Sequence, residues 1–364
     1  MKKVVIFDTA IATSNLGDEI ILDSLKKELA FLLDDSFVMR FGSHVKNFGV
    51  KHSLVGDRKT DFSYEADYKL ILGTNLLSRD LRRSQGQWPI DNLNSWLYWG
   101  SILAGVGTTY SEGRITAYSK KIYRRILRRD FAHSVRDDES KRFLESLGFQ
   151  AINTGCPTLW GITPELCQKI PSKKAKRCVL SLSGFTDQLD REHDQMLLDI
   201  LRQNYEELYF WCQTSLDESY LDTFDGVEEI PRIYSLTKYE ELLREGDIDY
   251  VGTRLHGGIY AIQHEVRTIV IAIDHRARGF NATNNVPICE RQDIPTRLAD
   301  MIQGEWQTEI IVDRTAIDSW KSQFFTDNTA PIDSARMGNP LMKATRKARI
   351  AYRRFRSEKD KENK

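Results

Sequence analysis

One arginine and one histidine stand two residues apart at the end of an expected β-strand, in the run Arg254-Leu255-His256-Gly257-Gly258. Arginine is a permanent cation that binds carboxylates and phosphates through paired hydrogen bonds, and histidine transfers protons near neutral pH. The two glycines leave backbone N–H groups open to an anion where a helix begins. We therefore expect an anion site with a proton carrier. The alternative is that Arg254 only pairs with a carboxylate and His256 only caps or packs.

A second loop of this kind contains Asn15, Gly17 and Asp18, after an expected N-terminal strand. Gly17 permits a tight turn, and Asn15 or Asp18 can cap the helix that we expect to begin near Glu19. Capping and ligand binding explain the loop equally well. The loop matches neither the Gly-x-Gly-x-x-Gly dinucleotide motif nor a P-loop.

Two further strand ends carry arginine. Asp137 or Asp138 can cap the helix expected over residues 140–147, but a cation near a helix N-terminus is unfavourable, so Arg136 needs another explanation. Binding a ligand is one such explanation. Arg276 and Arg278 follow a later strand and can face one phosphate, or can simply lie on the surface.

Composition and cysteine usage limit the class of protein. The 364 residues carry no net charge, and their hydrophobic and charged fractions of 41% and 29% are those of a soluble globular protein. Five scattered cysteines without a Cys-x-x-Cys pair indicate reduced thiols and a cytoplasmic protein. The sequence lacks a His-x-His or His-Glu-x-x-His pattern, so we expect no metal site. It also lacks the roughly 20 consecutive apolar residues that span a bilayer.

Strands and helices alternate along the chain, which predicts an α/β fold with parallel sheets. Residues 161–176 are the best linker candidate, and the alternation of strands and helices restarts after them. This restart indicates two Rossmann-like domains whose sheets face a central cleft. We expect an N-terminal α/β domain over residues 1–165. A C-terminal α/β domain follows over residues 166–325, with an extension and basic tail over 326–364. A basic helix is expected at residues 122–129.

Two regions can contact larger partners. From residue 341 to 364 there are ten basic and three acidic residues, a net charge of +7 that the rest of the chain balances. This tail is either a solvated helix or a peripheral contact with anionic membrane at its inner face, aided by Tyr352 and Phe355. The acidic remainder argues against nucleic acid as a partner. Trp88, Trp96 and Trp99 can stack on sugar rings, or can pack in a core.

Together these loops resemble the polysaccharide pyruvyl transferase family, which has Asn-x-Gly-Asp, Arg-Asp-x-x-Ser and Arg-Leu-His-Gly segments in this order. They stand here at residues 15–18, 136–140 and 254–257. The resemblance implies a GT-B-like fold, phosphoenolpyruvate as co-substrate without any cofactor, and a pyruvate ketal on a sugar of a polysaccharide or its lipid-linked precursor. It also implies that the N-terminal domain is the acceptor side and the C-terminal domain the donor side. Exopolysaccharide biosynthesis for the cell envelope is the implied context. The family's Asp-x-Lys segment is Asp274-His275-Arg276 here, and its Asp-Pro segment is Cys156-Pro157.

The implied reaction assigns a role to each site residue. His256 is the candidate acid that protonates the methylene carbon of phosphoenolpyruvate, and Asp18 or Asp137 accepts the hydroxyl proton. The other candidates bind the carboxylate and the departing phosphate, and these are Arg254, Arg136, Arg276, Gly257, Gly258, Asn15 and Gly17.

Two alternatives stay open at this point. A cation-rich site suits the diphosphate of a nucleotide-sugar, which would make the protein a GT-B-type glycosyltransferase. The replacements at Arg276 and Cys156 are also consistent with a non-catalytic glycan-binding relative.

Overall fold

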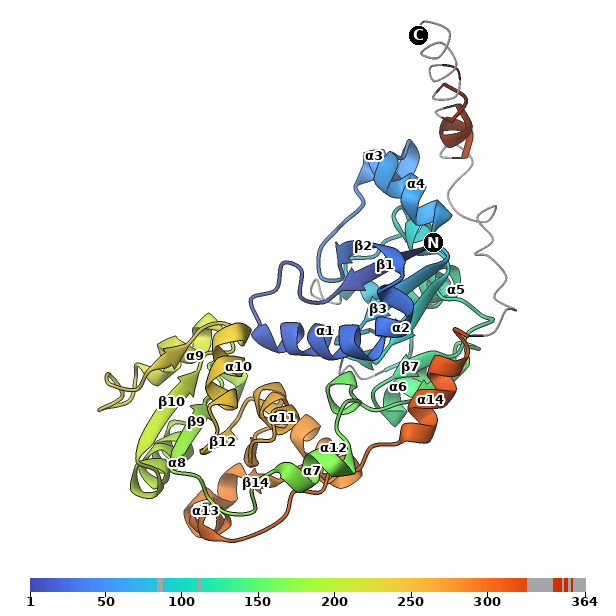
Figure 1. The fold of residues 1–364 in the computed structure, drawn as a ribbon. Helices are drawn as coiled ribbons and strands as arrows, with labels where there is room; N and C mark the ends of the chain where they lie inside the picture. Colours follow the sequence, from blue (N-terminus) through green and yellow to red (C-terminus); the bar gives the residue numbers. More distant parts are fainter. Residues whose placement is uncertain (84–87, 110–112, 326–342, 349, 353–354, 356–364) are drawn as a thin grey trace, which may run out of the picture. The chain divides into compact units, whose positions relative to one another are not determined.

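The computed structural model describes residues 1–83, 88–109, 113–325, 343–348, 350–352 and 355 (Figure 1). The chain divides into two compact units. Unit 1 comprises Met1–Ala12, Leu25–Pro157 and the described residues of Arg314–Lys364, and unit 2 comprises Thr13–Ser24 and Thr158–Asp313. Contacts thus group residues 13–24 with the later part of the chain and residues 314–325 with the earlier part. The predicted domain limits, at residues 165 and 325, follow chain order alone.

Unit 1 is built on a parallel sheet with the strand order β2-β1-β3-β5. Its strands are β1 (Lys2–Asp8), β2 (Ser36–Gly42), β3 (Tyr68–Leu72) and β5 (Ser101–Ala104). Strands β3 and β5 are buried along their whole length, as expected for strands covered on both faces.

Two short parallel pairs extend unit 1 beyond this sheet. Strand β4 (Asn75–Leu77) pairs with β6 (Gly107–Thr108), and β7 (His133–Val135) pairs with β8 (Ala151–Asn153). A bridge between Val106 and Val135 places β7 beside the carboxyl end of β5. The loops that follow β3, β5 and β7 therefore meet at one edge of unit 1.

Several helices of unit 1 begin at polar caps. Thr116 accepts a hydrogen bond from the N–H of Ser119 at 3.2 Å, and Asp137 accepts one from the N–H of Ser140 at 2.7 Å. Apart from α1 (Leu16–Glu28), which unit 2 shares, the α-helices are α2 (Ala30–Leu33), α3 (Val50–Leu54), α4 (Arg58–Glu65), α5 (Ala117–Ile126), α6 (Asp138–Glu145) and α14 (Arg314–Ser322).

Unit 2 contains a six-stranded parallel sheet with the order β11-β10-β9-β12-β13-β14. The strands are β9 (Arg177–Ser181), β10 (Glu207–Trp211), β11 (Arg232–Ile233), β12 (Ile248–Gly252), β13 (Thr268–Ala272) and β14 (Ile288–Glu290). The α-helices are α7 (Pro164–Lys169), α8 (Arg191–Asn204), α9 (Ser215–Leu221), α10 (Leu236–Arg244), α11 (Leu255–Gln263), α12 (His275–Asn284) and α13 (Ala299–Gln303). The predicted α/β class with parallel sheets is confirmed.

Several predicted helix limits were wrong. Helix α5 covers residues 117–126 instead of 122–129, because Thr116 caps it and Leu127 leaves it to bridge with Ser101 of β5. Helices α1 and α11 begin three residues earlier than expected, at Leu16 and Leu255. The family-like loops therefore contribute their glycines to the first turns of helices.

The predicted basic tail lies mostly outside the described residues. Of its ten basic residues, Lys343, Arg346 and Lys347 are described. Arg346 lies over the ring of Tyr64 in α4, with 4.8 Å between Cζ and the ring centroid, and 3.5 Å separates its Nε from Asp61 Oδ1. Within unit 1 this part of the tail thus contacts acidic residues of the protein itself.

Candidate functional site

Arg254, the N-cap residue of α11, forms a buried ion pair. Its Nε donates to Oδ2 of Asp217 at 3.0 Å, and its Nη2 donates to Oδ1 of the same carboxylate and to Thr214 Oγ1. The side chain of Arg254 is 6% exposed, and that of Asp217 is 0% exposed. The carboxylate pairing that the sequence left open is therefore present. Nη1 of Arg254 makes no hydrogen bond within the described part of the chain, so it is the donor left for a ligand.

The surroundings of this ion pair hold it in one geometry. Asp217 also accepts hydrogen bonds from the backbone N–H groups of Gly184 at 3.1 Å and Thr214 at 3.0 Å. The guanidinium of Arg254 lies over the ring of Phe185, with 4.5 Å between Cζ and the ring centroid. Charge, hydrogen bonds and the aromatic face together fix the direction of the remaining Nη1 donor.

The backbone of Arg254 is held by the strands beneath it. Its N–H donates to Ser181 Oγ at 3.1 Å, and its carbonyl accepts from the hydroxyl of Tyr250 at 2.7 Å. Burial raises the pKa of Tyr250, so its phenol keeps the proton that it donates. The turn between β12 and α11 is consequently a rigid element of unit 2.

Gly257 and Gly258 allow α11 to pack closely on the sheet. A Cβ on Gly257 would lie 3.0 Å from Cδ1 of Trp211, and one on Gly258 would lie 2.8 Å from Cε1 of Tyr250. In the described structure the N–H of Gly257 makes no hydrogen bond, so the first turn of α11 still offers a donor to an anion. His256 lies half-buried in this same turn. The close packing accounts for the glycines without any ligand.

The loop around Asn15 joins this turn through the end of β10. Oδ1 of Asn15 accepts from the N–H of Gly17 at 3.0 Å and from Nε2 of Gln213 at 2.9 Å. A Cβ on Gly17 would lie 2.8 Å from Gln213 Nε2, so glycine is required for this approach. Asp18 is nearly buried, and its Oδ2 accepts from Thr13 Oγ1 at 2.6 Å. Because α1 begins at Leu16, Asp18 lies inside the first turn of the helix and is not its cap.

Unit 2 contains two of the three family-like segments, at residues 15–18 and 254–257. Gln213 and its neighbour Thr214 connect these two segments. Gln213 contacts Asn15, and Thr214 contacts both Arg254 and Asp217. Gln213 Oε1 is buried and accepts no hydrogen bond from the described residues, a costly arrangement that is typical of functional sites. Sequence reasoning missed Gln213 and Asp217, although both follow strand β10 as the recognised loops follow their strands.

Arg136 and Asp137 lie at the carboxyl edge of unit 1. The side chain of Arg136 is 12% exposed and lies across Gly107, where an added Cβ would be 2.3 Å from Arg136 Nε and 2.5 Å from Asn75 Oδ1. Asp137 caps α6 through Oδ1, and its Oδ2 lies 3.4 Å from Arg136 Nε. Asp137 is thus a helix cap, as one interpretation of the sequence predicted. Residues of the loops after β3 and β5 lie beside Arg136.

Sequence reasoning also missed a polar group at the ends of β1 and β2. Asp8 is fully buried and accepts a hydrogen bond from Nε of Arg40 at 2.8 Å. Beside it, Thr9 Oγ1 and His44 Nε2 are 3.1 Å apart. An aspartate at the end of the first apolar strand was the feature of the sequence that could have indicated this group.

Arg276 folds back on the cap of its own helix. Its Nε and Nη2 donate to Asp274 Oδ2 at 2.9 and 2.6 Å, and its N–H donates to Oδ1. Burial raises the pKa of Asp274, but the charge and hydrogen bonds of Arg276 outweigh burial and lower it overall. Among the described residues, no hydrogen bond joins Arg276 to Arg254. Its role in binding phosphate stays a prediction.

The described residues contain no group of three or more His, Cys, Asp or Glu side chains arranged for a metal ion. Within the same part of the chain, no helix is long and apolar enough to cross a bilayer.

Comparisons with known proteins identify a family and a fold. The family model described as polysaccharide pyruvyl transferase matches residues 15–275. A solved structure of a putative UDP-N-acetylglucosamine 2-epimerase from Listeria monocytogenes is similar, with a TM-score of 0.50 and 13% identity over 90% of this chain and 97% of that one. A UDP-GlcNAc 2-epimerase from Methanocaldococcus jannaschii has a TM-score of 0.49 and 10% identity over 90% and 100% of the chains. No curated protein sequence matches significantly. The fold is the two-domain GT-B-like fold.

Proposed function

The chain belongs to the polysaccharide pyruvyl transferase family and is a transferase, and from this premise we propose that it transfers the pyruvyl group of phosphoenolpyruvate to a sugar. The acceptor is a glycan or its lipid-linked precursor, and the products are a pyruvate ketal and phosphate. The family match supports the proposal, because residues 15–275 include the three segments at residues 15–18, 136–140 and 254–257. The two segments in unit 2 are joined there through Gln213 and Thr214.

The proposed reaction balances without an oxidant, metal or cofactor. A proton adds to the methylene carbon of phosphoenolpyruvate, which becomes the methyl group and leaves an oxocarbenium-like centre at the neighbouring carbon. A sugar hydroxyl attacks this carbon and loses its proton. The bond to the phosphate oxygen then breaks, and a second hydroxyl of the same sugar closes the ketal and loses its proton. Of the two protons released, one replaces the proton that was donated and the other leaves with phosphate.

Three chemical tasks fall to residues of this chain. His256, in the first turn of α11, is the proposed acid, since imidazole has a pKa suited to proton transfer near pH 7. Arg254 Nη1, the N–H of Gly257 and the side chains of Arg136 and Arg276 are the proposed anion-binding groups. Asn15, Gly17 and Gly258 position these groups by allowing close packing.

The hydroxyl proton needs a carboxylate acceptor. Asp18 and Asp137 are the candidates, and both already accept hydrogen bonds inside their own units. We place the reaction in the cytoplasm, and the basic tail is a proposed peripheral contact with anionic membrane.

A donor screen by thermal shift tests the proposal before any acceptor is known. Phosphoenolpyruvate should raise the melting temperature, because a ligand at about 100 times its Kd adds roughly 2.7 kcal/mol to the free energy of unfolding. Inorganic phosphate and pyruvate, tested separately, should each raise it less. A shift with UDP-sugars and none with phosphoenolpyruvate would replace the proposal by a glycosyltransferase. No shift with either donor would favour a glycan-binding relative.

A further inference from the structure

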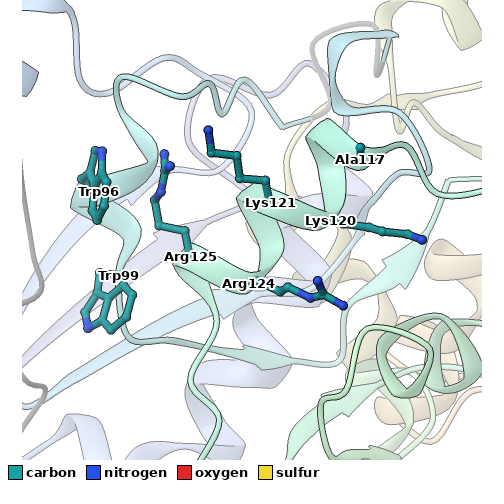
Figure 2. A pocket seen from close by; sticks show the side chains of 7 residues that line it. All are labelled: Trp96, Trp99, Ala117, Lys120, Lys121, Arg124 and Arg125. Carbon is teal, nitrogen blue, oxygen red and sulfur yellow. The ribbon is translucent and has the colours of Figure 1, made fainter.

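A cavity of about 470 Å³ opens in unit 1 between helix α5 and the segment before β5. We call it the tryptophan pocket, because the indole rings of Trp96 and Trp99 form one side. Figure 2 shows these rings facing α5, which presents cationic side chains. The pocket is lined by Trp96, Trp99, Ala117, Lys120, Lys121, Arg124 and Arg125.

The tryptophans of the pocket lie at the end of the sheet opposite to the candidate site residues of unit 1, and Arg136 is not among the residues that line the pocket. Trp99 comes directly before β5, and the end of α5 returns to the first residue of β5 through a bridge between Leu127 and Ser101. Arg136 instead lies at Gly107, beyond the carboxyl end of β5. The pocket is therefore distinct from the site that Arg136 belongs to.

Within the described part of the chain, the cations of the pocket have no ion-pair partner. Among the described residues no carboxylate forms an ion pair with the exposed Lys120, Lys121 and Arg124 or with the half-buried Arg125. By contrast, the half-buried or buried Arg128, Arg136 and Arg177 each have such a partner. Residues four apart on a helix are neighbours, so Lys120 repels Arg124 and Lys121 repels Arg125. An anion bound in the pocket would relieve this repulsion.

The aromatic side of the pocket is rigid. The buried Nζ of Lys69 donates to the carbonyls of Leu97 and Trp99 at 3.3 and 3.0 Å. Arg125 lies over the ring of Trp96, with 4.1 Å between Cζ and the ring centroid. Arg125 also donates to Ser95 Oγ at 2.7 Å. The backbone of Trp99 and the ring of Trp96 are thus held before any ligand arrives, which favours binding.

We propose that the tryptophan pocket binds an acidic glycan, with a sugar ring against tryptophan and its carboxylate or phosphate against the cations of α5. Tryptophan offers a flat apolar face with a polar edge, and lysine and arginine supply the opposite charge. Trp96 and Trp99 are half-buried and line a hollow. They do not project as the aromatic anchors of a membrane-bound helix would. A saccharide therefore fits this pocket better than a bilayer surface.

If the chain forms pyruvate ketals, as proposed above, the pocket can bind the product of its own reaction. A pyruvate ketal converts a neutral sugar into one that carries a carboxylate. A growing chain that already bears such groups would then be retained at the tryptophan pocket while another part of it is modified.

Binding measured without phosphoenolpyruvate tests the pocket separately from the reaction. The full chain is titrated by calorimetry with a hexamer of galacturonic acid, with maltohexaose as the neutral probe and phosphatidylglycerol vesicles as the membrane probe. We expect the acidic hexamer to bind and maltohexaose to bind at least about tenfold more weakly. The double variant Lys120→Gln/Arg124→Gln should weaken acidic binding about tenfold or more, and added salt should weaken it further.

The control variant removes two positive charges, as the pocket variant does, but elsewhere in unit 1. Lys51→Gln/Lys59→Gln alters exposed cations of α3 and α4 and should leave hexamer binding unchanged. Melting curves of both variants verify folding. Equal hexamer binding by the wild type and the pocket variant, or vesicle binding without hexamer binding, would overturn the proposal. Neither outcome bears on phosphate release from phosphoenolpyruvate.

Discussion

Arg254 is both a structural cation and a candidate ligand group. Its bidentate pairing with Asp217 uses Nε and Nη2, which leaves Nη1 for an anion. The sequence predicted the cation but could not supply its partner, because Asp217 lies 37 positions earlier on another helix. A loss of activity on replacing Arg254 would therefore mix lost ligand binding with lost folding.

Replacing Arg254 should destabilise the protein strongly. Arg254→Leu leaves the carboxylate of Asp217 buried without its counter-charge, which typically lowers the free energy of unfolding by about 3–5 kcal/mol. Urea denaturation measures this change. The double variant Arg254→Leu/Asp217→Leu should recover part of it, since no isolated charge remains.

A matched control is the ion pair between Arg276 and Asp274, in which the arginine is 35% exposed. Arg276→Leu should lower the free energy of unfolding by no more than about 1 kcal/mol, because solvent screens the pair. Equal losses for Arg254→Leu and Arg276→Leu would show that the buried pair has no special structural role.

Helix α11 illustrates what sequence could and could not predict about elements. The alternation of apolar and polar residues predicted a strand, a turn and a helix near residue 254, and all three are present. The helix begins earlier because Arg254 is its N-cap, and its glycines are needed for packing on Trp211 and Tyr250. Such close approaches depend on residues from other strands, so a local pattern cannot reveal them.

Two helical glycines of unit 2 allow a direct test of this packing. Gly258→Ala places a methyl group 2.8 Å from Tyr250 Cε1, and we expect the free energy of unfolding to fall by about 1–3 kcal/mol. Gly279 in α12 has no atom within 4 Å of an added Cβ, so Gly279→Ala should raise stability by up to about 1 kcal/mol. Denaturant midpoints compare the two variants. A stabilising Gly258→Ala would contradict the packing argument.

At the scale of the whole molecule, the α/β class and the parallel sheets could be predicted from the alternation of strands and helices. The interleaving of the units could not, because residues 13–24 join unit 2 through long-range contacts such as that between Asn15 and Gln213. That interleaving brings the Asn15 and Arg254 segments of the family pattern into one unit. The central claim for the molecule as a whole is pyruvyl transfer to a sugar.

The most direct test of this claim is the formation of a ketal from phosphoenolpyruvate labelled with ¹³C at its second carbon. Wild-type protein is incubated with a panel of methyl hexosides and disaccharides while phosphate release is recorded. We predict phosphate release matched by a ¹³C ketal resonance. His256→Gln should lower kcat by about 10²–10⁴-fold and keep the thermal shift with phosphoenolpyruvate, whereas His193→Gln, in the first turn of α8, should keep full activity. Labelled phosphoenolpyruvate that yields no ketal with any acceptor, or an unchanged kcat for His256→Gln, would contradict the account.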